Sequence, residues 1–103
     1  MITYAKDANF HDLIAQGPVL VDFFSKTCGP CKLIARVLED LDDEFPFIQI
    51  VKVDVDECPQ VSEEYGISGI PDLYFYKDGK LAIRELGAVG EDVIRGHLAE
   101  ILY

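Results

Sequence analysis

Two nearly continuous apolar runs, separated by a segment of helical periodicity, constrain the fold of this 103-residue chain most strongly. Residues 19–24 (VLVDFF) and 47–55 (FIQIVKVDV) are each typical of a strand that is buried on both faces. Between them, apolar residues recur at helical spacing over residues 34–45. This alternation of buried strand and amphipathic helix predicts an α/β layered domain.

The rest of the chain continues the alternation. Asp7 is predicted to cap a short helix that Gly17 ends, and Cys58 with Pro59 is predicted to open another short helix. The other predicted elements are an edge strand at 2–5, strands at 72–76 and 81–86 joined by an Asp-Gly turn, and a last helix at 93–102. Together they predict one domain over residues 1–103 with a mixed sheet.

Composition narrows the classes of function. The chain has 19 acidic and 9 basic residues, and its net charge is −10. Phosphate contacts need clustered Lys and Arg, so we expect no nucleic-acid partner and no binding to an anionic membrane surface. No apolar run reaches the ~20 residues of a membrane span, and the first residues lack the pattern of a signal peptide. We therefore expect a cytoplasmic protein that acts as a monomer.

The segment Cys28-Gly29-Pro30-Cys31 is the sharpest signal of chemistry. Two cysteines at this spacing, where a buried strand meets a helix, are typical of a redox-active dithiol. The partial positive charge and free N–H groups of a helix N-terminus would stabilise a thiolate at Cys28. A zinc site is the less favoured alternative, because only Cys58 and two histidines remain as ligands. Two structural cysteines at this spacing are the other alternative.

Two charged residues, Asp22 and Lys52, lie inside otherwise apolar strands. A buried carboxylate is expected to have a raised pKa or a charged partner, and Lys52 is the candidate partner. Asp22, six residues before Cys28, is therefore a candidate proton acceptor. The alternative is that Asp22 lies at a strand end near solvent.

The chain resembles the thioredoxin family over essentially its whole length. The blocks that carry the resemblance are VDFFSKTCGPCK, VKVDVDE, YGISGIPDLYFYKDGK and ELGAV. The resemblance implies the thioredoxin fold, a mixed five-stranded sheet flanked by four helices, and a protein disulfide reductant that works by dithiol–disulfide exchange. It also implies disulfide-containing protein substrates, electrons from a thioredoxin-reductase-type donor, and no bound cofactor besides a redox-active Cys28–Cys31 disulfide.

The resemblance also implies roles for individual residues. Cys28 would be the nucleophile, Cys31 the resolving cysteine and Asp22 the buried proton acceptor. The implied supporting residues are Gly29, Pro30 and Lys52. The implied substrate-binding residues are Thr27, Ile70, Pro71 as a cis-proline, and Gly87. No metal ligand is implied.

Three positions depart from the family pattern. Thr27 and Phe24 replace tryptophans, and Asp72 replaces a threonine. We expect Asp72 to favour basic substrates, with Lys26 or Lys32 partly neutralising its charge. Two alternative functions stay open, a non-catalytic thioredoxin-fold binding module and a specialised reductant for one dedicated partner enzyme. The intact CGPC motif counts against the first.

The third cysteine, Cys58, resembles an extra cysteine of some family members. Its acidic neighbours Asp54, Asp56 and Glu57 should oppose formation of a thiolate. We therefore expect Cys58 to be structural.

Overall fold

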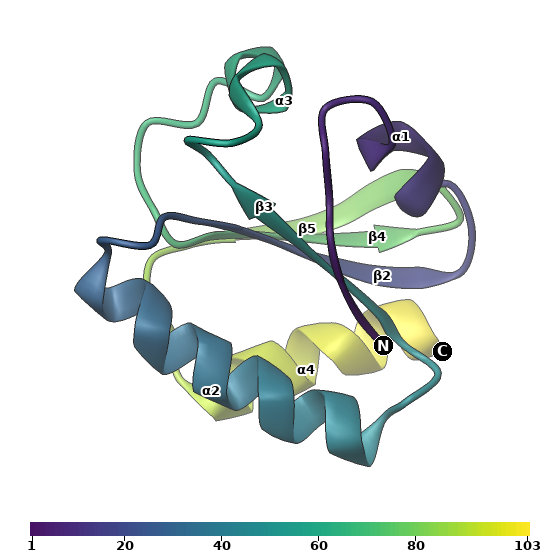
Figure 1. Cartoon of the computed structure of the whole chain (residues 1–103). Coiled ribbons are helices and arrows are strands. Elements are labelled where there is room, and N and C mark those ends of the chain that lie inside the picture. The colour runs from purple at the N-terminus through teal and green to yellow at the C-terminus, as the bar shows by residue number, and fades with distance from the viewer.

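The central strand β2 (Pro18–Phe24) is paired on both sides within a five-stranded sheet, in a computed structural model that describes residues 1–103 (Figure 1). The other strands are β1 (Ile2–Tyr4), β3 (Gln49–Asp54), β4 (Asp72–Lys77) and β5 (Lys80–Leu86). The helices are α1 (Phe10–Leu13), α2 (Gly29–Glu44), α3 (Pro59–Glu64) and α4 (Glu91–Leu102).

The sheet is mixed, in the order β1-β3-β2-β4-β5. Strands β1 and β2 run parallel to β3, whereas β4 is antiparallel to both β2 and β5. Strand β1 lies at an edge, as the sequence predicted. The expected mixed five-stranded sheet with four helices is thus confirmed.

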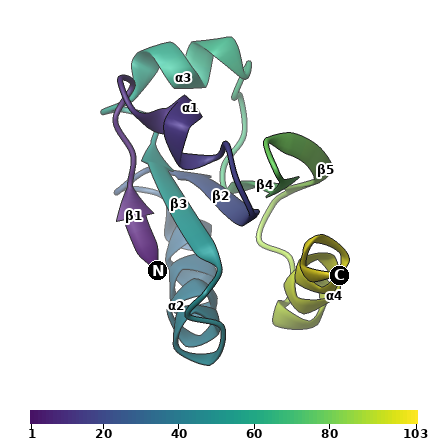
Figure 2. The same ribbon diagram turned by 90° about the vertical axis from the view of Figure 1, so that its right-hand side faces the viewer.

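Helices cover both faces of the sheet, with α1 and α3 on one face and α2 and α4 on the other (Figures 1 and 2). Alternate residues of each strand enter separate cores because successive side chains point to opposite faces. Phe23 and Tyr74 belong to the core beneath α1 and α3. Leu20 and Phe75 belong to the core against α2 and α4. Strands β2 and β4 are therefore buried on both faces of the sheet, which explains their nearly continuous apolar sequences.

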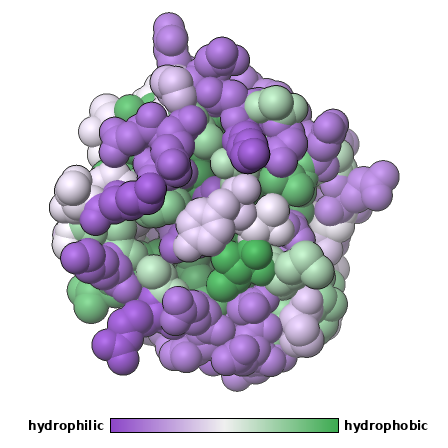
Figure 3. All heavy atoms as spheres, in the orientation of Figure 1, coloured by the Kyte–Doolittle hydropathy of each residue, from purple (hydrophilic) through white to green (hydrophobic).

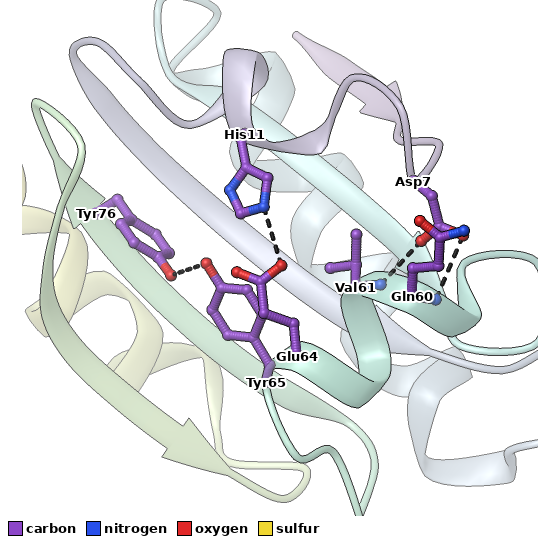
Figure 4. A network of polar contacts seen from close by, with 7 residues as sticks. All are labelled: Asp7, His11, Gln60, Val61, Glu64, Tyr65 and Tyr76. Atoms are coloured by element: carbon purple, nitrogen blue, oxygen red, sulfur yellow. Dashed lines mark hydrogen bonds and ion pairs between the residues drawn. The ribbon is translucent and has the colours of Figure 1, made fainter.

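Both predicted ends of α1 are wrong. The helix ends at Leu13, well before Gly17, and Asp7 does not cap it, because its N-cap residue is Asn9. The Asp7 carboxylate instead accepts hydrogen bonds from the backbone N–H groups of Val61 (2.9 Å) and Gln60 (3.4 Å), at the start of α3 (Figure 4). Cys58 is the N-cap residue of α3, as predicted, but its side chain makes no capping bond. The acceptor comes from a distant part of the chain.

Two further contacts join this layer of helices (Figure 4). His11 of α1 lies 3.0 Å from the Glu64 carboxylate of α3. The Tyr76 hydroxyl of β4 donates to the Tyr65 hydroxyl, 3.0 Å away, just after α3. The short helices α1 and α3 are thus connected to each other and to the sheet by polar groups as well as by the core.

The predicted β4–β5 hairpin is confirmed, with Asp78 at φ 51° and Gly79 at φ 80° in the turn. The strand expected at 47–55 is shorter than predicted, because Phe47 is exposed ahead of β3. Hydrophilic side chains cover most of the face seen in Figure 3, with small apolar areas near its centre. No helix has the length and apolar character that crossing a membrane requires.

Candidate active site

The two cysteines of the CGPC segment form a disulfide at the N-terminus of α2, with their Cα atoms 5.3 Å apart. Cys28 is the N-cap residue, and its sulfur accepts a hydrogen bond of 3.2 Å from the backbone N–H of Cys31. Pro30 in the first turn removes no helical hydrogen bond, because the first N–H groups of a helix have no intrahelical acceptor. Cys28 is half-buried and Cys31 is buried. Cys28 is therefore the more accessible of the two cysteines.

The loop of residues Gly69–Pro71 lies against the disulfide. Its Ile70–Pro71 peptide bond is cis, and the Ile70 carbonyl oxygen is 3.9 Å from Cys28 Sγ. Gly87, at φ 101°, donates its backbone N–H to the Pro71 carbonyl oxygen at 2.8 Å. Three of the four implied substrate-binding residues are thus at this loop: Ile70 and Pro71 are part of it, and Gly87 is hydrogen-bonded to it. The fourth, Thr27, is exposed and directly precedes Cys28.

Asp22 and Lys52 form a buried ion pair. They are opposite each other in the parallel β2–β3 ladder, and Lys52 Nζ lies 3.5 Å from Asp22 Oδ2, at the outer limit for a hydrogen bond. Neither Asp22 oxygen has a closer partner, and none of the residue is exposed to solvent. Burial raises the pKa of the Asp22 carboxyl to about 6, and the Lys52 charge limits the rise. The expected partner is confirmed, and the alternative of a solvent-exposed strand end is wrong.

The aromatic rings of Phe24 and Tyr4 cover Lys52, a contact that the sequence alone did not predict. Its ammonium nitrogen is 4.6 Å from the centroid of the Phe24 ring and 5.8 Å from that of Tyr4. Both distances fit cation–π attraction. Tyr4 is opposite Lys52 in the β1–β3 ladder, which continues the row from Asp22 to the sheet edge. Because sequence patterns do not determine the register of an edge strand, no signal in the sequence identified Tyr4.

Asp72 is buried, with no exposed surface, and its partner is neither Lys26 nor Lys32. Arg84 of β5 donates to both of its carboxylate oxygens, from Nε at 3.1 Å and from Nη2 at 2.7 Å. Lys26 instead lies 3.5 Å from the carboxylate of Glu57. The expected neutralisation by lysine is therefore wrong, because the antiparallel β4–β5 ladder brings Arg84 to Asp72.

Cys58 is buried and is the one cysteine outside the disulfide. Its Sγ donates to the Ala5 carbonyl oxygen at 3.3 Å. Burial raises the pKa of the Cys58 thiol, and the charges of Asp7, Asp54 and Glu57 raise it further. Two of these three acidic residues were expected from the sequence. No group of three or more His, Cys, Asp or Glu side chains is arranged to hold a metal ion.

Comparison with known proteins places this arrangement in a family. The family model described as Thioredoxin matches residues 1–100. A thioredoxin of Chlamydia muridarum is 46% identical over 92 residues, which cover 89% of this chain and 90% of that protein. A thioredoxin of Bacillus subtilis is 44% identical over 87 residues, 84% of each chain. The fold also matches a solved structure, which comes from work on the thiol-resolving mechanism of yeast mitochondrial 1-Cys peroxiredoxin via glutathione/thioredoxin systems. The two chains superpose with a TM-score of 0.87 and are 29% identical, and the match covers 96% of this chain and 94% of the other.

A helix-terminal dithiol beside a cis-proline loop, on this mixed sheet, defines a protein-disulfide oxidoreductase. The chain belongs to the thioredoxin family. Its Cys28–Cys31 pair carries out dithiol–disulfide exchange, with disulfide-containing substrates and a reductase as the electron donor.

Proposed function

We propose that the chain is a general protein disulfide reductant in which Cys28 is the nucleophile, Cys31 the resolving cysteine and Asp22 the proton acceptor. The observation that carries this assignment is the unequal exposure of the two cysteine residues. Cys28 is half-buried, whereas Cys31 is 3% exposed and lies on the buried side of its helix. A substrate disulfide therefore meets Cys28 first.

The reaction has two exchange steps. The Cys28 thiolate attacks one sulfur of the substrate disulfide, and the substrate S–S bond breaks as the mixed disulfide forms. The departing substrate sulfur takes up a proton. Cys31 then attacks Cys28 Sγ, which releases the second substrate thiol and forms the Cys28–Cys31 disulfide. The substrate is reduced by two electrons, and a separate reductase returns two electrons to the dithiol.

Asp22 would accept the proton that Cys31 loses in the second step, directly or through water. It is on the α2 face of the sheet, in the strand position two residues after Leu20, which packs in that core. Cys31 is on the buried side of α2. A carboxyl with a pKa of about 6 exchanges its proton near neutral pH, as a general base requires.

The positions of the other residues are consistent with the supporting and binding roles proposed for them. Gly29 and Pro30 form the first turn of α2, which brings the Cys31 N–H group to Cys28 Sγ. Lys52 limits the rise of the Asp22 pKa. Thr27, Ile70, Pro71 and Gly87 would hold the substrate backbone beside Cys28. Because Thr27 stands where the family usually has tryptophan, a reductant specialised for one partner enzyme is the second candidate.

Further parts of the proposal rest on the whole chain. Residues 1–103 would act as one cytoplasmic domain and as a monomer. The net charge of −10 supports the proposal that it binds neither nucleic acid nor an anionic membrane. Light scattering in dilute solution tests the monomer, and a mass of twice 11.5 kDa would contradict it.

The trapping of mixed disulfides tests the roles of the two cysteines. Cys31→Ser should accumulate a stable mixed disulfide with a disulfide substrate, because it retains the attacking thiol and lacks the resolving one. Cys28→Ser should trap nothing. Equal trapping by both variants on a non-reducing gel would overturn the assignment. Reduction of insulin with dithiothreitol as electron source separates a reductant from a binding module, which would give no turnover.

A further inference from the structure

The buried Asp72 carboxylate holds the Arg84 guanidinium in one orientation. Arg84 makes two parallel hydrogen bonds to it, of 3.1 and 2.7 Å, in the bidentate geometry that arginine forms with carboxylates. The guanidinium carbon lies 5.4 Å from the centroid of the Tyr74 ring, and Tyr74 is opposite Arg84 in the β4–β5 ladder. The side chain is therefore fixed both by the carboxylate and by the ring.

Only the positive member of the pair reaches solvent. The Arg84 side chain is 46% exposed, whereas that of Asp72 is 0% exposed. The bonds to Asp72 use Nε and Nη2, so the N–H groups of Nη1 are free of that carboxylate. This end of the sheet thus presents hydrogen-bond donors and positive charge, although the residue that differs from the family pattern is acidic.

The pair adjoins the loop at the disulfide. Asp72 directly follows Pro71, and Cys28 Sγ lies 3.9 Å from the carbonyl oxygen of Ile70, the residue before Pro71. Leu86 is opposite Asp72 in the β4–β5 ladder and is 55% exposed. A substrate chain that extends from this loop along β5 would therefore meet the apolar Leu86 side chain first and the Arg84 cation two residues further along the strand.

We propose that Arg84 is a specificity-determining residue, which binds a carboxylate in an acidic segment beside the disulfide of the protein substrate. This inference rests on the proposed function and adds the chemical class of substrate to it. Lys26, the basic residue closest to Cys28 on its N-terminal side, is paired with Asp54 and Glu57. The Arg84–Asp72 pair is neutral overall, but the guanidinium is its solvent-facing side, so it offsets locally the repulsion that a net charge of −10 imposes on acidic partners. The preference is opposite to the one that the Asp72 carboxylate alone would produce.

Three peptides with the same disulfide loop, flanked by Glu, Gln or Lys, test this preference. The measurement is kcat/KM for their reduction with dithiothreitol as electron source. The double variant Asp72→Asn, Arg84→Gln removes the pair, leaves no unpaired buried charge and keeps the net charge unchanged. We expect it to lower the ratio of kcat/KM for the Glu peptide over the Lys peptide by about three- to fivefold, the range of one exposed charge contact. The wild-type ratio should also fall with added salt.

The control is Lys80→Gln, at the first residue of β5, directly after the hairpin turn and at the opposite end of the strand from the loop. It removes an exposed positive charge of β5 and leaves the Asp72–Arg84 pair intact, so the ratio should stay within about 1.5-fold of wild type. An unchanged ratio in the double variant would overturn the inference. An equal fall in kcat/KM for all three peptides would also overturn it, because it would indicate a structural role only. If the wild-type chain reduces none of the peptides, the proposed function itself fails and the inference with it.

Discussion

Asp22 and Lys52 face each other across the β2–β3 ladder, 3.5 Å apart between Oδ2 and Nζ, with no exposed surface on the carboxylate. The pair lies beneath α2, the helix that carries the disulfide at its N-terminus. The positive charge of Lys52 therefore offsets part of the energetic cost of burying the Asp22 carboxylate away from water. This pair links the stability of the fold to the protonation of a group beneath the disulfide.

Asp22→Asn should change how stability depends on pH. The folded-state pKa of about 6 is above the ordinary value of 3.8, so folding favours the protonated carboxyl. The contribution of this group is therefore fully present below about pH 4 and is lost as pH rises through 6. The free energy of unfolding of Asp22→Asn, relative to wild type, should rise by up to about 3 kcal/mol between about pH 3.5 and 7.5.

Urea denaturation at several pH values measures that difference. Asp12→Asn, at an exposed position of α1, is the matched control and should show a nearly constant difference. A pH-independent difference for Asp22→Asn would show that the carboxyl titrates alike in the folded and unfolded chain.

Asp22 should also control the pH profile of disulfide reduction. Asp22→Asn should slow turnover near neutral pH by about tenfold or more, because the proton acceptor is lost. Lys52→Met should move the inflection near pH 6 upward, because the lysine charge lowers the pKa of Asp22. Stopped-flow reduction of insulin between about pH 5 and 8 measures both effects. An unchanged profile in Asp22→Asn would exclude a role in proton transfer.

Phe24 should stabilise the fold through the Lys52 ammonium group, which lies 4.6 Å from its ring centroid. Phe24→Leu removes this cation–π attraction, whereas Phe24→Trp keeps it. A double-mutant cycle of Phe24→Leu with Lys52→Met should give a coupling energy of about 0.5–2 kcal/mol. Denaturation of the four proteins measures it. A coupling energy near zero would mean that the ring contributes packing alone.

Cys58 should stay unreactive in the folded, reduced protein. Its thiol is buried, and both burial and nearby carboxylates raise its pKa, so little of it is thiolate at neutral pH. Iodoacetamide should label Cys28 first and Cys58 only in denaturant, as peptide mass spectrometry would reveal. Labelling of Cys58 at the rate of Cys28 in the native chain would contradict this account.

Asp7→Ala should destabilise the fold by about 1 kcal/mol, the usual cost of losing an N-terminal cap. The carboxylate bonds to the N–H groups of Val61 and Gln60, so the variant leaves the start of α3 without these acceptors. Urea denaturation measures the loss, with Asp12→Ala as the control. A loss no larger than that of the control would show that water replaces the cap without cost.

Much of the fold was predictable because its signals are local. Apolar runs and helical periodicity reveal strands and helices, and an Asp-Gly pair selects the hairpin turn at Asp78. The same holds for the disulfide, because Cys28 and Cys31 lie one helical turn apart at the start of α2. The prediction of the cap by Asp7 was wrong, because Asp7 can serve either α1, which follows it in the sequence, or α3, which is distant in the sequence, and the sequence does not distinguish the two.

Residue type and local spacing alone are enough to predict the alternation of strands and helices, the dithiol at a helix start, and the need of Asp22 for a partner. Each of these depends on residue type and spacing within a few positions. Three contacts could be recognised only in the folded chain: Tyr4 covers Lys52, Asp7 caps α3, and Arg84 rather than a lysine neutralises Asp72. Each of these contacts depends on the register between strands or on the packing of distant segments, which the periodicity of a single segment does not encode.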